Sequence, residues 1–486
     1  MAQHNIKRSV TIYSWHRQVE MGMLTWEDCI KAAVKMGCQG VELLGQLYFR
    51  YCPEALQEDI DSWKQLMFDY GMQTVCHDFF VDMTMYNHRR LTTRESVDII
   101  RRHALFSRSI NCPIMRIGGT VSPEVFRQSA PILEDLGIKM GLEIHNGSSS
   151  FILPNVQGII DVIRETGSPA IGIVPDMSMF SLKIGNRQLN NAKNNGVDPD
   201  FVDSIAETYT KVSNEEFRAI CNEALEKAED DATRSFLAMV RRVEYFDPKV
   251  LLEHMPYIFH CHGKFYEMDE NCEETTLDYP GILAALKEGG YRGYISAEYE
   301  GAPINGDTFE PFRRYEKMLD KYLGTYPDGN YPDWPDARPA PMTGGFGSAS
   351  DNLCPEGFKN HYDAEGNCDG FCVNVRNFYY RGVPLALFES AHVSVDGEIF
   401  GPDKMRVEVD GEVFKFEDMC DVTLHYWNKG VHATLIVDKP GGLAPGKHQV
   451  AATTVVRAYY MREGIAGQIQ KNELQMPPAH EMELET

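Results

Sequence analysis

Short apolar runs alternate with amphipathic segments along the first 325 residues of the chain. Each run is rich in β-branched residues and leads through polar residues into a segment with helical periodicity that ends near a glycine. The predicted strands are SVTIYSW, QGVELLG, MQTVCHDFF, CPIMRIGG, IKMGLEIH, AIGIVPD, YIFHCHGKF and GYISAEYEG. Strands that alternate with helices in this way predict an α/β fold, a parallel sheet closed into a (β/α)8 TIM barrel over residues 1–325.

The segment between the sixth and seventh runs is too long for one connection. About 80 residues separate these runs, whereas a βα unit takes about 30. The excess, from about residue 180 to 249, is polar and has helical periodicity. An insertion after the carboxyl end of a barrel strand lies over the mouth, so it is either a lid that shapes substrate specificity or an oligomer contact. The sequence supports both interpretations equally.

The pattern changes after Gly324. Prolines and then glycines dominate residues 326–345, which predicts a linker. Residues 346–486 carry short alternating runs punctuated by Asp-Gly turns and by PGGLAPG. These runs are AHVSVDG, MRVEVDG, VTLHYW, ATLIVD and QVAATTVVRAYYM. The simplest prediction is a small all-β, sandwich-like domain.

Charge and composition exclude several classes of protein. The formal net charge of −24 disfavours nucleic acid and anionic membrane surfaces, because both are bound through clustered Lys and Arg. No stretch reaches the length of a membrane span, and the first residues lack the apolar segment of a signal peptide. We therefore expect a cytoplasmic enzyme that acts on a small molecule, without nucleic-acid or membrane partners, and that forms a homo-oligomer.

The cysteines point to reduced thiols. Twelve are scattered through a long chain, which is not the pattern of a disulfide framework. Cys354, Cys368 and Cys372, with His361 between them, form the one local concentration. Because this stretch lacks paired CxxC motifs, we favour free thiols in an irregular loop over a zinc site.

Polar side chains gather where the last four predicted barrel strands end. They are Glu143 and His145, then Asp176, then His260, His262 and Lys264, and finally Glu298 and Glu300. Residues two apart in a strand share a face, so all of these side chains can point inward at the mouth of the barrel. Glutamates, an aspartate and a histidine make an oxygen-rich ligand set, which suits Mn²⁺ best, with Mg²⁺ or Co²⁺ as alternatives.

Four further residues fall at earlier strand ends. Glu42, His77, Asp78 and Arg116 can bind substrate hydroxyls or act as acid and base there. Hydrogen bonding between helix and sheet is an equal alternative for each of them.

The strand endings GLEIH, VPD, HCHGK and SAEYEG, in this order, resemble the sugar isomerase/epimerase barrels related to xylose isomerase. The resemblance covers nearly all of residues 1–325 but is specific at these strand ends. It implies a xylose isomerase-like TIM barrel in which Glu143, Asp176, His262 and Glu298 bind a divalent metal.

The second half carries a more specific resemblance. YYRGVPLALFESAHVSVDGE and TLIVDKPGGLAPGKH resemble the small β subunit of bacterial C-glycoside deglycosidases, whose α subunit is an isomerase-like barrel. The resemblance implies both subunits fused in one chain, with Arg381 or Tyr380 near the barrel mouth. It also implies a substrate that is a glycoside oxidised to a ketone at sugar carbon 3, whose anomeric bond is cleaved by elimination.

The predicted chemistry assigns a role to each candidate. The 3-oxo group makes the proton on carbon 2 acidic, and His145, two residues from ligand Glu143, is our first choice of base. Lys264 is the second catalytic candidate, and it shares with His260 and Glu300 the task of orienting substrate or protonating the aglycone. His260, Glu300, Arg116 and His77 are the predicted substrate-binding residues.

Three alternatives stay open. The broken bond is C–C or C–O. A divalent-metal sugar isomerase or epimerase uses the same proton abstraction but returns the proton. The third alternative is not an enzyme but a carbohydrate-binding protein without catalytic activity.

Overall fold

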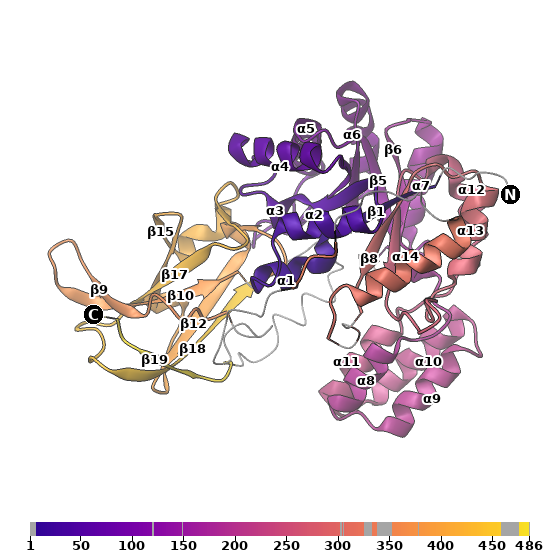
Figure 1. Ribbon diagram of the computed structural model, residues 1–486. Helices are drawn as coiled ribbons and strands as arrows, with labels where there is room; N and C mark the ends of the chain where they lie inside the picture. Colours follow the sequence, from indigo (N-terminus) through magenta and orange to yellow (C-terminus); the bar gives the residue numbers. More distant parts are fainter. Residues whose placement is uncertain are drawn as a thin grey trace.

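The computed structural model describes residues 6–118, 121–147, 149–301, 304, 306–324, 333–337, 352–377, 379–457 and 476–485. The first half is a parallel eight-stranded barrel surrounded by helices (Figure 1). Its strands are β1 (Lys7–Thr11), β2 (Gly40–Leu44), β3 (Gln73–Phe80), β4 (Ile114–Gly118), β5 (Lys139–Ile144), β6 (Ile171–Pro175), β7 (Cys261–Phe265) and β8 (Tyr294–Tyr299). They confirm the predicted fold class.

The barrel closes between β6 and β7. The other strands are joined in the order β6-β5-β4-β3-β2-β1-β8-β7. At the seam, the amide of Phe259 donates to the carbonyl of Ile173 at 3.1 Å, and parallel bridges join Ile173 to Ile258 and Asp176 to His262. The last bridge brings two predicted metal ligands side by side.

Helices pack around the barrel between its strands. They are α2 (Trp26–Lys35), α4 (Gln57–Asp69), α5 (Thr93–Ser109), α6 (Pro123–Leu136), α7 (Pro154–Thr166), α12 (Val250–His254), α13 (Tyr279–Glu288) and α14 (Glu310–Leu323). Thr25 and Thr92 each begin a helix with reciprocal capping bonds, to Asp28 and Glu95. Gly137 ends α6 in the left-handed conformation, at φ 68°, which a glycine adopts without steric cost.

The first predicted strand is too long. The strand ends at Thr11, and Ile12–Trp15 form the 3₁₀ helix η1, which leads into α1 (His16–Glu20). Trp15 is fully buried against Phe312 of α14, with ring centroids 4.6 Å apart. An apolar residue buried by a helix gives the same sequence pattern as one buried in a strand.

The insertion folds as four helices with a core of their own. They are α8 (Asn186–Asn194), α9 (Pro199–Tyr209), α10 (Asn214–Lys227) and α11 (Asp231–Val240). Val202, Phe217 and Leu237 are buried in this core. Figure 1 shows the bundle as a separate lobe on one side of the barrel. None of the helices in the described ranges has the length and apolar character that crossing a lipid bilayer requires.

The C-terminal region consists of antiparallel sheets. One sheet has the order β15-β14-β17-β10-β9 and another the order β13-β12-β18-β19, with β11 and β16 as a separate pair. The strands are β9 (Lys359–Tyr362), β10 (Cys368–Arg376), β11 (Val383–Pro384), β12 (Phe388–Val395), β13 (Glu398–Phe400), β14 (Met405–Val409), β15 (Glu412–Lys415), β16 (Tyr426–Trp427), β17 (His432–Asp438), β18 (Lys447–Val456) and β19 (His480–Glu483). Both larger sheets contribute to one core, for example through Phe371 and Val393, which confirms the all-β prediction.

Turn residues fix the hairpins of this domain. Asp396 and Gly397 have φ values of 50° and 87°, as a two-residue hairpin turn requires. The predicted strand VTLHYW is wrong for most of its length, because only Tyr426 and Trp427 form a strand, β16, which pairs with Pro384 and Val383. The predicted strand QVAATTVVRAYYM is described only up to Arg457, and the rest lies outside the described residues.

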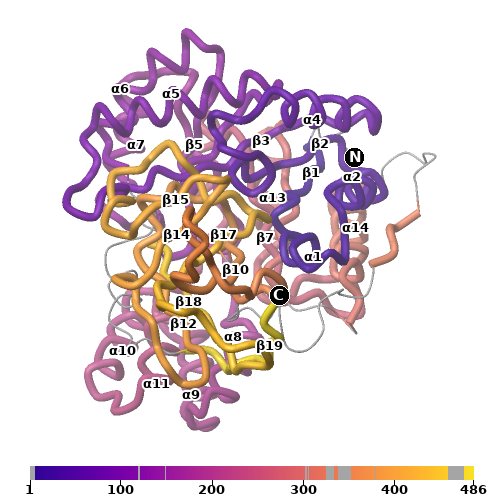
Figure 2. Tube along the Cα trace, turned by 90° about the vertical axis from the view of Figure 1, so that its left-hand side faces the viewer, coloured from indigo at the N-terminus to yellow at the C-terminus, as the bar shows by residue number. Residues whose placement is uncertain are grey.

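The β domain lies beside α1 and α3 (Gly45–Tyr48) of the barrel (Figure 1) and faces the viewer in Figure 2. Arg381 is fully buried at this junction, where its guanidinium donates to both carboxylate oxygens of Asp82, at 2.7 and 2.9 Å, and to Oε1 of Gln46, at 2.9 Å. The ring of Tyr380 contacts those of Phe80 and Tyr13. Both residues therefore lie at the carboxyl ends of the barrel strands, as the resemblance implied.

Candidate active site

Four of the predicted residues converge at the carboxyl ends of β5 to β8. Nδ1 of His262 lies 3.0 Å from Oε1 of Glu143, 3.5 Å from Oδ2 of Asp176 and 3.2 Å from Oε2 of Glu298. The strand register explains this, because Asp176 bridges to His262 and Glu298 lies opposite Lys264 in the β7–β8 pair. We call these four residues the ligand cluster.

The ligand cluster has the donor atoms of a cation site. Asp176 Oδ2 and His262 Nδ1 are buried, and neither has a hydrogen bond of acceptable geometry to any residue the structure describes. Buried polar atoms are normally satisfied, because an unsatisfied one costs about 1–3 kcal/mol. Three carboxylates and one imidazole nitrogen at one point fit a hard divalent cation such as Mn²⁺.

Glu42 of β2 contacts His262 through Nε2, the ring nitrogen that does not face the ligand cluster. Its Oε1 lies 2.5 Å from Nε2 of His262, and its Oε2 lies 3.0 Å from Nε2 of His260. Burial raises the pKa of Glu42, but the two imidazoles outweigh burial and hold it well below the usual value. An ionised carboxylate only accepts, so Nε2 of His262 carries a proton and Nδ1 is the ring nitrogen directed at the ligand cluster.

Two buried cations balance the carboxylates. The Lys264 ammonium lies 2.7 Å from Oε2 of Glu298 and 3.3 Å from Oε1 of Glu300. Burial raises the pKa of Glu298, but Lys264 and His262 bring it to about 2. On the opposite side, Arg116 donates to Glu143 Oε2 at 3.2 Å and to Asp78 Oδ1 at 3.1 Å. The carboxylates of the cluster are therefore charged at neutral pH.

His145 stands beside the ligand cluster with one ring nitrogen engaged. Its Nδ1 lies 2.6 Å from the carbonyl oxygen of Asn146. A carbonyl oxygen only accepts, so Nδ1 carries the proton and Nε2 keeps a lone pair. His145 also lines a cavity of about 770 Å³ at the mouth of the barrel. A neutral imidazole in this tautomer is suited to take a proton from a bound molecule.

The insertion forms part of the wall of this cavity. Arg187, Gln188 and Asn191 of α8 and Met239 of α11 line it together with His145 and Glu300. The guanidinium of Arg187 donates to the carbonyl oxygen of Glu300, which ties the insertion to the end of β8. The insertion therefore lies at the mouth of the barrel, the position from which both interpretations, a lid and an oligomer contact, were predicted.

Three of the four predicted substrate-binding residues, His77, His260 and Arg116, do not line the cavity. His77 lies on the other face of β3, where its Nδ1 is 2.8 Å from Oγ of Ser107 in α5 and its ring packs on that of His103. His260 is fully buried beneath the ligand cluster, between Glu42 and Ser296. His77 therefore makes a hydrogen bond between sheet and helix, which was the alternative to substrate binding. Arg116 lies next to the ligand cluster, and Glu300 lines the cavity.

The sequence did not identify several residues that line the cavity. Tyr13 and His16 follow β1, and Tyr266 follows β7. Burial, and then Glu300 and Glu298, raise the pKa of Tyr13, while burial lowers the pKa of His16 to about 4. Tyr266 directly follows the predicted strand YIFHCHGKF, so its place at a strand end was the available signal.

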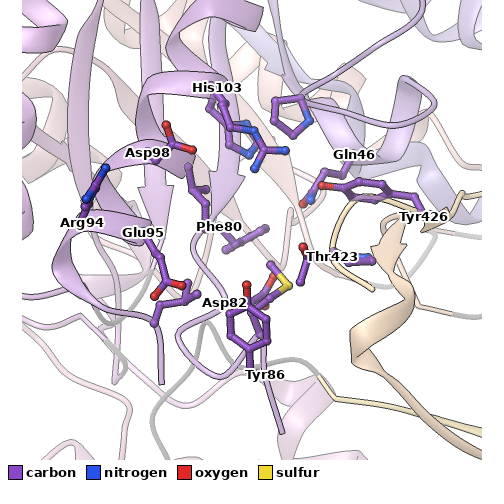
Figure 3. Close-up of a pocket in the computed structure, with 16 residues that line it drawn as sticks. Gln46, Phe80, Asp82, Tyr86, Arg94, Glu95, Asp98, His103, Thr423 and Tyr426 are labelled. Atoms are coloured by element: carbon purple, nitrogen blue, oxygen red, sulfur yellow. The ribbon is translucent and has the colours of Figure 1, made fainter. Parts of the chain in front are cut away.

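A second cavity, of about 460 Å³, lies at the junction of the barrel and the β domain (Figure 3). Gln46, Phe80 and Asp82 line it from the barrel, and Thr423 and Tyr426 from the β domain. We place the candidate chemistry in the larger cavity, because His145 and Glu300, which neighbour the ligand cluster, line that cavity and not this one.

Among the cysteines of the β domain, Cys354 lies close enough to Glu356 and His432 for the three to share a metal ion. All twelve are free thiols, and neither Cys368 nor Cys372 belongs to a possible ligand group among the described residues. His361 lies instead 2.5 Å from a carboxylate oxygen of Asp369.

Comparison with known proteins agrees with this division of the chain. The family model described as xylose isomerase-like TIM barrel matches residues 30–320, and the model described as C-glycoside deglycosidase β subunit matches residues 349–460. A 3'-dehydrocarminate deglycosidase α subunit from Microbacterium is 24% identical over 331 residues, which cover 65% of this chain and 94% of that protein.

Two further relatives match the two halves. A C-glycoside deglycosidase α subunit from Arthrobacter globiformis is 27% identical over 316 residues, which cover 62% of this chain and 86% of that protein. A C-glycoside deglycosidase β subunit from Eubacterium cellulosolvens is 31% identical over 105 residues, which cover 22% of this chain and 71% of that protein. The separate subunits of the relatives thus correspond to consecutive parts of one chain.

Proposed function

Because the chain belongs to the xylose isomerase-like TIM barrel family and carries a C-glycoside deglycosidase β subunit domain in the same polypeptide, we propose that it is a metal-dependent lyase that deglycosylates 3-oxo-C-glycosides. The observation that carries the proposal is the ligand cluster beside a histidine whose Nε2 is free to accept a proton. The fused β domain favours this activity over a plain isomerase or epimerase.

Glu143, Asp176, His262 and Glu298 would hold the metal, with Mn²⁺ as the first choice and Mg²⁺ or Co²⁺ as alternatives. When bound, a divalent cation stabilises the negative charge that develops on the substrate's ketone oxygen. The remaining chemistry belongs to the side chains around the cluster.

His145 is the proposed base. Its Nε2 takes the proton from sugar carbon 2, which the neighbouring ketone makes acidic. The electron pair of that C–H bond forms the double bond between carbons 1 and 2, and the bond from carbon 1 to the aglycone breaks. The aglycone gains one proton as it leaves, so the reaction needs neither an oxidant nor a reductant.

Lys264 is proposed to stabilise and orient the substrate by its charge. Burial lowers the pKa of this ammonium, but Asp176, Glu298 and Glu300 outweigh burial and raise it well above the usual value. A group that holds its proton so firmly is a poor acid but a permanent cation beside a developing oxyanion. Glu300, at 3.3 Å from the ammonium, fixes its position.

The decisive experiment compares oxidised and unoxidised substrates. The chain, supplied with Mn²⁺, is incubated with a 3-oxo-C-glycoside, the matching 3-oxo-O-glycoside and their unoxidised parents, and the products are identified by mass spectrometry. We expect release of the aglycone from 3-oxo compounds alone, because a positioned base cannot remove the carbon 2 proton without the ketone. Rapid cleavage of an unoxidised parent would indicate a hydrolase.

Replacing His145 tests the assignment of the base. His145→Ala is expected to lower kcat by a factor of about 10² to 10⁴, the usual contribution of general base catalysis, while metal content stays unchanged. Kinetics and metal analysis of the same preparation measure both. His88→Ala, at an exposed position of the barrel that lines neither cavity, is the control and should keep wild-type kcat and metal content. Loss of metal together with activity would make His145 a ligand instead.

A further inference from the structure

Basic side chains surround the outer part of the larger cavity. Arg17 comes from α1, Lys183 precedes α8, Arg187 lies in α8 and Arg242 follows α11. The acidic residues that line the same cavity are Glu267 and Glu300. Cations thus outnumber carboxylates there, in a chain whose formal net charge is −24. Such a local reversal of sign attracts an anion into the cavity.

Two of these cations have no protein partner. In the ranges covered by the structure, neither Arg17 nor Lys183 makes an ion pair or a side-chain hydrogen bond. Both carboxylates, in contrast, are engaged: Glu267 accepts from Nδ2 of Asn186 at 2.7 Å, and Glu300 lies 3.3 Å from the Lys264 ammonium. The positive charge of Arg17 and Lys183 is therefore available to a ligand.

The basic side chains come from other elements of the fold than the ligand cluster, whose neighbours His145 and Glu300 line the cavity. The cluster stands on the ends of β5 to β8, whereas Arg17, Lys183, Arg187 and Arg242 come from α1 and from the insertion with its flanking residues. A cavity of about 770 Å³ has the size of a pocket for a ligand larger than one sugar ring. With the sugar at the cluster, the aglycone extends toward the basic side chains.

We propose that the substrate carries an anionic oxygen group, a carboxylate on its aglycone, and that Arg17 and Lys183 select for it. This inference rests on the proposed function, since that function places the sugar at the ligand cluster. A phosphate on the sugar is the other source of the same charge and is an arm of the test.

The test compares matched substrates and variants. Three 3-oxo-C-glucosides are used: one with a carboxylated phenolic aglycone, its methyl ester, and the methyl ester with a 6-phosphate on the sugar. At low ionic strength we expect kcat/KM for the carboxylate to exceed that for the ester about tenfold, the effect of two screened charges. Arg17→Gln combined with Lys183→Gln should bring the ratio close to one, and so should high salt.

Lys227→Gln is the matched control. Lys227 ends α10 of the same insertion, pairs with Glu223 and does not line the cavity, so this variant should keep the wild-type preference. A ratio near one in the wild type, or a ratio that the double variant leaves unchanged, overturns the inference. If kcat/KM rises for the 6-phosphate substrate but not for the carboxylate substrate, the anionic group lies on the sugar, and the assignment to the aglycone is overturned.

A binding measurement separates this inference from the proposed lyase activity. Titration calorimetry with 4-hydroxybenzoate and with its methyl ester needs no turnover. Tighter binding of the acid to the wild type, lost in the double variant and kept in Lys227→Gln, supports the anion site even if no glycoside is cleaved. Equal binding of acid and ester in a protein that cleaves 3-oxo-glycosides overturns the anion site and leaves the proposed function standing.

Discussion

Asp176→Asn and Glu298→Gln are each expected to abolish both metal binding and turnover. Each change keeps the shape of the side chain but removes one negative charge from a ligand atom that lies 3.5 or 3.2 Å from Nδ1 of His262. A hard cation that is strongly hydrated needs charged oxygen ligands to leave water. In the wild type, Mn²⁺ at a hundred times its Kd is expected to stabilise the fold by about 2.7 kcal/mol and to raise Tm.

The metal-induced rise in Tm is a readout that does not depend on activity. Neither variant should show it, and metal analysis after dialysis should find less than a tenth of the wild-type content. Glu300→Gln is the control, because Glu300 directly follows β8 and contacts Lys264 but is not part of the ligand cluster, and it should keep the rise in Tm. A wild-type response in Asp176→Asn would place the metal elsewhere.

The ligand cluster could be predicted because it depends on two simple periodicities. Parallel strands present their carboxyl ends at one edge of the barrel, and side chains alternate along each strand, so the polar residues at the ends of β5 to β8 were expected to lie together. The resemblance to the xylose isomerase-related barrels selected Glu143, Asp176, His262 and Glu298 among them, and these four do face one another. Length and order of the apolar runs were enough to count the strands.

The alternation of side chains along a strand does not tell which of two neighbouring residues faces the barrel interior. His77 and Asp78 are neighbours in β3, so one points to α5 and the other to Arg116 in the barrel interior. Which of them faces inward depends on the register, and the pairing of β2 with β3 shifts between Val41 and Glu42. Such an irregularity leaves no clear mark in the sequence.

Contacts between segments that are distant in the sequence could not be predicted. The role of Glu42 depends on β2 and β7 facing each other across the barrel, which joins residues 42 and 262 through a contact of 2.5 Å. The path of η1 and α1 brings Tyr13 to the cavity because Trp15 packs against α14, not because of any local signal.

A fully buried ion pair lies at the junction between the domains, and it provides a test of whether the β domain serves the candidate active site. Arg381 is fully buried and Asp82 is 2% exposed, with two bonds of 2.7 and 2.9 Å between them. The neighbouring Tyr380 contacts Tyr13, which lines the larger cavity, at a ring distance of 5.6 Å. Docking of the β domain and the shape of the cavity are therefore physically connected.

Arg381→Met is expected to cost about 3–5 kcal/mol of stability, because it leaves the Asp82 carboxylate buried without a partner. We also expect kcat/KM on the 3-oxo substrate to fall, since Tyr13 loses the support of Tyr380 once the domains separate. Urea denaturation and steady-state kinetics on the full chain measure the two effects.

The control is Arg406→Met in the same domain. Arg406 is partly exposed and pairs with Asp369 and Asp438 at 3.2 Å, so this loss should cost at most about 1 kcal/mol. Adding Asp82→Leu to Arg381→Met should restore part of the stability, because an apolar side chain then replaces the unpaired buried carboxylate. If the two residues were independent, the double variant would instead be destabilised by the sum of the two single effects. If Arg381→Met destabilises the chain no more than Arg406→Met and leaves kcat/KM unchanged, the β domain is an appendage and the barrel acts alone.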